Sequence, residues 1–264
     1  GEPLLHPEFP LIWERLTEMG FFLTLQTNAS LVRGKMLDLL ECCPPRQAKV
    51  TLYGSDDEVY QAVCGVEQGF TRVNEGIHNL MSVGIPVTLV STIIRQNQND
   101  VERMAFYAYR HKLPWLATGS VKPSLRGAST DPLAVAVTEK MEEQRRREVE
   151  ARLREGRFVD PNRKPATYCR DYRLGYWVTW NGMMRFCSFM NEPNIPVRNL
   201  PFKEAWRQLL DFEEALDWPE ECKTCKAAKT CQRCAAAMRF GCDWWAKQGC
   251  KGSEQCNNKP MEGC

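Results

Sequence analysis

The chain has 264 residues, enough for one large domain and a smaller one. Its formal net charge of +2 is too small to indicate a nucleic acid or an anionic membrane as a partner. No apolar run reaches the roughly 18 residues of a membrane span, and no secretion signal opens the chain, so we expect a cytoplasmic protein with no membrane partner.

Helix-like and strand-like segments alternate over residues 1–128. A glycine or a proline pair closes three of the predicted helices, at Gly20, Pro44-Pro45 and Gly84. Such alternation is typical of βαβ units and predicts an α/β fold with a parallel sheet or barrel. The predicted helices cover residues 11–19, 32–42, 71–83 and 99–112, and the predicted strands cover residues 21–26, 48–53, 86–92 and 115–122.

A charged stretch follows, with the sequence MEEQRRREVEARLREGR and little apolar face. We interpret residues 129–165 as a solvated helical linker that separates a domain at 1–128 from one at 166–264. The second domain begins with a predicted β-hairpin, because Asn181-Gly182 lies between two strand-like runs and fits a type I′ turn. An amphipathic helix is predicted at residues 200–212.

Cysteine is the unusual residue of this composition. Ten of the 13 cysteines occur from position 169 onward, and an odd total without a secretion signal argues against disulfides. The most specific run has the form Cys-x2-Cys-x5-Cys-x2-Cys over residues 222–234. Such short spacings suit iron–sulfur clusters, whereas the cysteine pairs of zinc sites usually lie about 12–20 residues apart. Iron–sulfur ligation is therefore favoured, with a zinc-stabilised scaffold as the alternative.

The complete cysteine pattern, with its Gly182-x4-Cys187 element, resembles the SPASM domain. This small, loop-rich α+β domain is the C-terminal extension of many radical S-adenosylmethionine (SAM) enzymes, and the resemblance implies two auxiliary 4Fe-4S clusters. It departs from the common pattern in having two residues, not three, between the third and fourth cysteines of the run. For one cluster the implied ligands are Cys169, Cys187 and Cys234. For the other they are Cys222, Cys225, Cys231 and one late cysteine. Spacing favours Cys256 as this late cysteine, with Cys250 or Cys242 as the alternatives.

The first residues extend the resemblance. Gly1-Glu2-Pro3 is similar to the end of the family's Gly-Gly-Glu-Pro stretch, which lines the amino-acid end of SAM, and a glutamate there can pair with the ammonium group. Asn28 and Thr51 are similar to further SAM-binding positions, whereas Cys64 replaces an arginine that contacts SAM in some members. The resemblance implies a partial radical SAM barrel that lacks its first strand or strands.

One family motif is missing from these 264 residues. The SAM-binding cluster rests on Cys-x3-Cys-x2-Cys, upstream of Gly-Glu-Pro in the family, and no such spacing occurs here. We therefore expect this chain to be a fragment of a longer protein and to be inactive in SAM cleavage by itself.

Three functions agree with these patterns. The leading one is a radical SAM enzyme that modifies a peptide, by a thioether or another cross-link in a ribosomally synthesised peptide, with flavodoxin or ferredoxin as electron donor. The second is a sulfatase-maturing, formylglycine-generating enzyme, although that group carries an aspartate base where Ser188 stands. The third is a non-catalytic iron–sulfur electron-transfer or metal-binding module. The sequence identifies no catalytic base.

Overall fold

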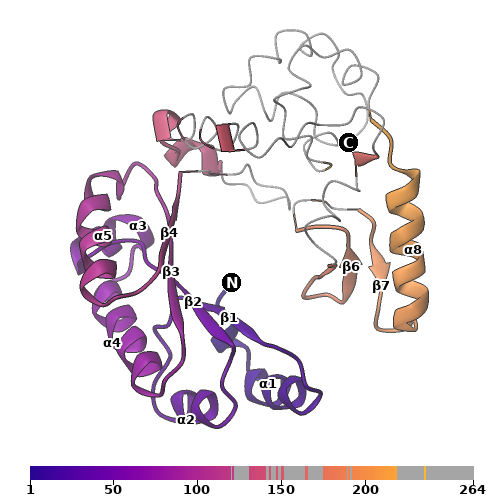
Figure 1. The fold of residues 1–264 in the computed structure, drawn as a ribbon, viewed down its shortest axis with the longest axis horizontal. Helices are drawn as coiled ribbons and strands as arrows, with labels where there is room; N and C mark the ends of the chain where they lie inside the picture. Colours follow the sequence, from indigo (N-terminus) through magenta and orange to yellow (C-terminus); the bar gives the residue numbers. More distant parts are fainter. Residues whose placement is uncertain are drawn as a thin grey trace. The chain divides into compact units, whose positions relative to one another are not determined.

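A computed structural model describes residues 1–119, 121, 131–140, 175–188, 190 and 192–218, together with residues 143, 147, 150, 151, 164, 165 and 235. Two compact units divide the chain. The first comprises Gly1–Val121 and Leu133–Met141, and the second comprises Lys122–Pro132 and Glu142–Cys264. Figure 1 shows the helices and strands of both units.

The first unit is built on a parallel sheet of four strands, in the order β1-β2-β3-β4. Every neighbouring pair is parallel, as the alternation of segments predicts. The bounds of each strand lie within four residues of the predicted ones. The strands are β1 (Thr24–Thr27), β2 (Gln47–Thr51), β3 (Val87–Thr92) and β4 (Trp115–Thr118).

The connections between these strands are helical, which lets successive parallel strands run in the same direction. One helix, α3, has no counterpart among the predicted helices. Its ends are nevertheless well marked: the Asp56 carboxylate accepts a hydrogen bond from the Val59 N–H at 2.8 Å, and Gly65 ends the helix with a φ of 66°. The helical elements are η1 (Pro3–Leu5), α1 (Phe9–Glu18), α2 (Lys35–Cys42), α3 (Asp57–Cys64), α4 (Gly69–Ser82), η2 (Gln98–Asp100), α5 (Val101–Arg110) and η3 (Pro132–Val135).

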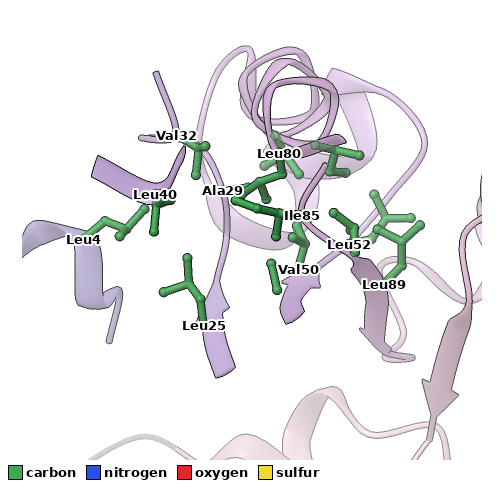
Figure 2. Close-up of a cluster of buried hydrophobic side chains, with 14 of the residues drawn as sticks. Leu4, Leu25, Ala29, Val32, Leu40, Val50, Leu52, Leu80, Ile85 and Leu89 are labelled. Atoms are coloured by element: carbon green, nitrogen blue, oxygen red, sulfur yellow. The ribbon is translucent and has the colours of Figure 1, made fainter. Parts of the chain in front are cut away.

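The hydrophobic core lies between the sheet and its helices. Val50 of β2 and Leu89 of β3 are fully buried and belong to one cluster with Leu80 of α4 and Met104 of α5, as Figure 2 shows for several members of the cluster. Helices α3, α4 and α5 lie on the same side of the sheet (Figure 1). The alternate side chains of β2 and β3, on the opposite face, are all half-buried.

Helix α4 touches the turn that follows β1. A Cβ atom on Gly76 would lie 2.0 Å from the carbonyl oxygen of Ala29, so only glycine allows this approach. Ala29 itself has a φ of 59°, which is uncommon for a residue other than glycine. The Asn79 amide donates a 2.8 Å hydrogen bond to the Val32 carbonyl in the same connection. The helix therefore fixes the backbone just beyond the carboxyl end of β1.

The described residues of the second unit contain an antiparallel sheet in the order β5-β6-β7 and a long helix. Its elements are β5 (Trp177–Val178), β6 (Met183–Arg185), β7 (Ile195–Pro196) and α8 (Phe202–Ala215). The buried side chains of Met184, Met190 and Leu209 pack the helix against this sheet. Both the hairpin and the amphipathic helix of the sequence analysis are present.

The type of the hairpin turn is a correction. A type I′ turn needs a positive φ at both central residues, but only Gly182 has one, at 76°. The Gly182 N–H donates to the Thr179 carbonyl at 2.9 Å, and the Thr179 N–H donates to the Met183 carbonyl at 2.9 Å. The glycine therefore occupies the bulge position after the turn, where a left-handed residue is needed.

Much of the predicted linker at 129–165 and of the cysteine-rich domain at 166–264 lies outside the described residues. Among the helices that the structure describes, none combines the length and the apolar character needed to cross a membrane.

Candidate functional site

Each strand of the parallel sheet ends in threonine, at Thr27, Thr51, Thr92 and Thr118. Because the strands are parallel, these four residues lie along one edge of the sheet. Ligands of open α/β sheets bind outside this carboxyl edge, and Thr92 and Thr118 are direct partners in the register of β3 and β4. We therefore expect a binding site at this edge of the sheet.

Glu2 lies at the β1 end of this edge. Its Oε1 atom accepts hydrogen bonds from the Thr27 hydroxyl at 2.7 Å and from the Leu4 N–H at 3.2 Å. Its Oε2 atom accepts a 2.7 Å hydrogen bond from the Asn28 N–H. The carboxylate thus joins the first residues of the chain to the end of β1, and it brings together Glu2 and Asn28, two residues predicted to bind SAM.

The Asn28 side chain shapes the turn that follows. Its Oδ1 atom accepts hydrogen bonds from the Ser30 N–H at 2.9 Å and from the Ser30 hydroxyl at 2.6 Å. The Thr27 hydroxyl oxygen accepts a further bond from the Ala29 N–H at 2.9 Å. No hydrogen bond from the Asn28 amide nitrogen to any other described residue occurs. That NH₂ group is half-buried and remains a donor for a ligand oxygen.

The other predicted cofactor residues lie nearby. Thr51 ends β2, the strand next to β1, and its half-buried side chain is on the sheet face opposite the hydrophobic core. Pro3 begins η1 and is half-buried. Gly1 is exposed, with no atom within 4 Å of the position where its Cβ would be. The predicted set thus gathers around the carboxyl ends of two neighbouring strands.

A second polar network, made of residues outside the predicted site, joins the loops after β2 and β3. Asn97 is only 1% exposed. Its amide nitrogen donates to the carbonyls of Tyr53 at 3.0 Å and Thr92 at 3.1 Å, and its Oδ1 atom accepts from the Ile94 N–H at 2.8 Å. One side chain therefore satisfies three backbone groups of two loops.

Asp100 extends this network. Its carboxylate is 4% exposed and accepts hydrogen bonds from the Ser55 N–H at 2.6 Å and the Ser55 hydroxyl at 2.8 Å. Arg103 bridges Asp100 at 3.5 Å and Asp56 at 2.6 Å. The Val59 N–H, followed by Arg103, lowers the pKa of Asp56. The polar residues at positions 97–100 are a local signal for such a network. Their hydrogen-bond partners Tyr53 and Ser55, however, are 44 and 45 residues away along the chain.

The proposed cluster ligands are represented by one described residue. Cys187 follows β6, is half-buried and packs against the hydrophobic cluster of the second unit. Cys169, Cys222, Cys225, Cys231, Cys234 and Cys256 lie outside the described residues. In the part of the chain that the structure describes, no three His, Cys, Asp or Glu side chains are grouped so that they could hold a metal ion.

Comparison with known proteins agrees with the site in the first unit. Residues 1–108 match the family model of the radical SAM superfamily. The probable GTP 3′,8-cyclase of Pyrobaculum aerophilum is 32% identical over 101 residues, which cover 38% of this chain and 32% of that protein. The AdoMet-dependent heme synthase of Methanosarcina barkeri is 22% identical, over 89% of this chain and 75% of that protein. The PqqA peptide cyclase of Ruegeria pomeroyi is 27% identical over 39% of this chain and 28% of that protein.

Solved structures show the same fold. Streptococcus suis SuiB bound to its precursor peptide SuiA matches with a TM-score of 0.64 at 13% identity, over 88% of this chain and 58% of that one. The enzyme anSMEcpe with bound AdoMet matches with a TM-score of 0.55 at 14% identity, over 98% of this chain and 83% of that one. The chain thus spans about a third of the first curated relative and 28% of the peptide cyclase, but 75% of the heme synthase. The similarity to the radical SAM superfamily is thus a match to its family model over residues 1–108.

Proposed function

We propose that this chain belongs to a radical SAM enzyme that modifies a peptide, by a thioether or another cross-link in a ribosomally synthesised substrate. The observation that carries the proposal is the contact of Glu2 with Thr27 and Asn28, at 2.7 Å in each case. It joins the Gly-Glu-Pro segment to the carboxyl edge of a parallel sheet, where ligands bind. The family match over the same residues supports it.

The residues at this edge fit the methionyl end of SAM. That end carries one carboxylate and one ammonium group. The Asn28 NH₂ is a donor suited to the carboxylate, and the remaining lone pair of the Glu2 Oε2 atom is an acceptor suited to the ammonium. The Thr51 hydroxyl, on the neighbouring strand, is proposed to contact the same ligand.

The cysteines of the second unit are proposed to hold two auxiliary 4Fe-4S clusters, in the two groups given by the resemblance to the SPASM domain. Cys187 has the half-buried position after a β-hairpin that such a ligand needs, because a cluster must be shielded while its thiolates reach it. When bound, SAM and the iron–sulfur clusters supply one-electron chemistry and hydrogen abstraction. Flavodoxin or ferredoxin is the proposed electron donor.

A peptide substrate is supported by two of the matched proteins. One is named a peptide cyclase and the other was crystallised with a precursor peptide. A second candidate is a tetrapyrrole-type small substrate, because the heme synthase match extends over 89% of this chain. Formylglycine formation remains a weaker candidate, since Ser188 stands where an aspartate base would be needed.

The test is to reconstitute the protein, at its natural length, with iron and sulfide and to measure three quantities. These are iron and sulfide content, 5′-deoxyadenosine formed from SAM under reducing conditions, and the mass of a candidate peptide encoded nearby. We expect visible absorption from the auxiliary clusters, together with deoxyadenosine and a loss of two hydrogens from the peptide on cross-linking. Zinc without colour would support a scaffold, and clusters without deoxyadenosine would support an electron-transfer module.

A further inference from the structure

The parallel sheet has a second face, opposite the hydrophobic core, which we call the open face. In the register of the strands it carries Gln26 of β1, Lys49 and Thr51 of β2, and Thr88 and Val90 of β3. These side chains are half-buried or exposed, whereas their neighbours along each strand are buried. Lys49 is the only charged side chain that the four strands place on this face.

Among the described residues, no carboxylate lies within ion-pair distance of Lys49. Lys49 forms no hydrogen bond and no ion pair with any residue in the part of the chain that the structure describes. Its cross-strand neighbours are the uncharged Gln26 on one side and Thr88 on the other. Lys49 is half-buried as a residue, and a lysine can lay its stem along the sheet while its ammonium group stays available to an anionic ligand.

If the open face were covered by water, a lysine that extends into solvent would equally well explain why Lys49 has no partner among the described residues. Two features argue against that reading. Lys49 lies on an inner strand, between β1 and β3, and parallel sheets are normally covered on both faces. The remaining polar groups on this face are hydroxyls and amides, which bind ligands as well as water, and not the mixed charges of an ordinary protein surface.

We propose that Lys49 binds a carboxylate of the ligand that covers the open face. The proposal rests on the proposed function, in which SAM binds at the carboxyl edge of the sheet and contacts Thr51, a residue of the open face. Thr51 lies two residues farther along the same strand than Lys49, so the Cα atoms of the two residues are about 6.6 Å apart. The flexible lysine side chain is long enough to span such a distance. The carboxylate has two sources, the methionyl group of SAM or an acidic group of the substrate.

The experiment compares four forms of the protein at its natural length: wild type, Lys49→Met, Lys49→Arg and the control Lys35→Met. Lys35 is exposed at the start of α2 and away from the strands, so its replacement removes the same charge without touching the open face. All four are first compared by circular dichroism and thermal unfolding to establish equal folding.

The first arm measures binding of SAM and of 5′-methylthioadenosine, which lacks both the carboxylate and the ammonium group. If SAM supplies the carboxylate, Lys49→Met weakens SAM binding at least tenfold and leaves methylthioadenosine binding unchanged. Lys49→Arg and Lys35→Met then bind SAM within about threefold of the wild type.

The second arm titrates N-acetylglutamate amide and N-acetylglutamine amide at millimolar concentration, observed by ligand NMR. If the substrate supplies the carboxylate, the wild type prefers the glutamate compound, and Lys49→Met loses that preference while SAM binding stays normal. The proposal is overturned if Lys49→Met matches the wild type in both arms. A wild type that binds neither SAM nor methylthioadenosine contradicts the proposed function, and the second arm still decides the role of Lys49.

Discussion

The carboxylate of Glu2 accepts a 2.7 Å hydrogen bond from the backbone N–H of Asn28, which lies 26 residues farther along the chain. The same carboxylate also accepts the Thr27 hydroxyl. Glu2 therefore has a structural role at the end of β1 in addition to any contact with SAM.

Replacing Glu2 by glutamine removes the acceptor at Oε2 and places an NH₂ group against the Asn28 N–H. We expect a loss of about 1–3 kcal/mol in the free energy of unfolding, because a partly buried donor loses its partner. Urea denaturation measures the loss, and hydrogen exchange should show faster exchange at Asn28. Glu18→Gln is the control, since Glu18 is exposed and bridges only Arg15. Equal stability of the two variants would show that the Glu2 contacts contribute nothing.

The Asn97→Ala variant tests the network between the loops after β2 and β3. It leaves the carbonyls of Tyr53 and Thr92 and the N–H of Ile94 without their present partner. We expect destabilisation of roughly 2–3 kcal/mol, measured by thermal or urea unfolding. Asn99→Ala is the matched control, because Asn99 is exposed two residues away and should change stability by less than about 0.5 kcal/mol. Similar losses in both variants would contradict this role of Asn97.

The Gly76→Ala variant tests the close approach of α4 to the turn after β1. Alanine normally favours a helix over glycine by up to about 1 kcal/mol. Here a Cβ atom would lie 2.0 Å from the Ala29 carbonyl oxygen, so the helix must move. We expect the variant to be less stable than the wild type by about 2 kcal/mol or more. Glu75→Ala, at the exposed neighbouring position, should be neutral or slightly stabilising, and a stabilised Gly76→Ala would disprove the contact.

His111 provides a pH dependence. Burial, followed by the nearby His78 and Arg110, lowers the pKa of His111, and the rings of the two histidines lie 4.9 Å apart. Because the folded state holds the proton less well than the unfolded state, the neutral form stabilises the fold above pH 6.5. That stability declines as the pH falls through the lowered pKa.

Urea denaturation at pH 7.5 and at pH 5.5 measures this effect. We expect the wild type to lose more stability between the two pH values than His111→Gln does, because the glutamine side chain does not titrate. An identical pH dependence in the two proteins would show that His111 does not contribute to it.

Local sequence patterns predict the alternation of strands and helices and the parallel sheet, whereas Glu2, Asn28 and Thr51 were predicted as site residues through the family resemblance. Apolar strands, helix-ending glycines and a β-hairpin with Asn181-Gly182 are local signals, because each depends on backbone preferences within a few residues. The same local reasoning assigned a type I′ turn, and only the fold showed that Gly182 alone has a positive φ. Helix α3 has no counterpart among the predicted helices, although Asp56 and Gly65 mark its two ends.

The tertiary structure decided the contacts between distant segments. Glu2 reaches Asn28, Asp100 reaches Ser55, and Gly76 meets Ala29 only because the parallel sheet brings the ends of successive strands to one edge. The isolation of Lys49 also follows from register, since only the pairing of β1, β2 and β3 shows which side chains share its face. The sequence shows which residue types are present and how far apart they lie along the chain. The distance in space between two side chains that are far apart in the chain depends on how the strands pair.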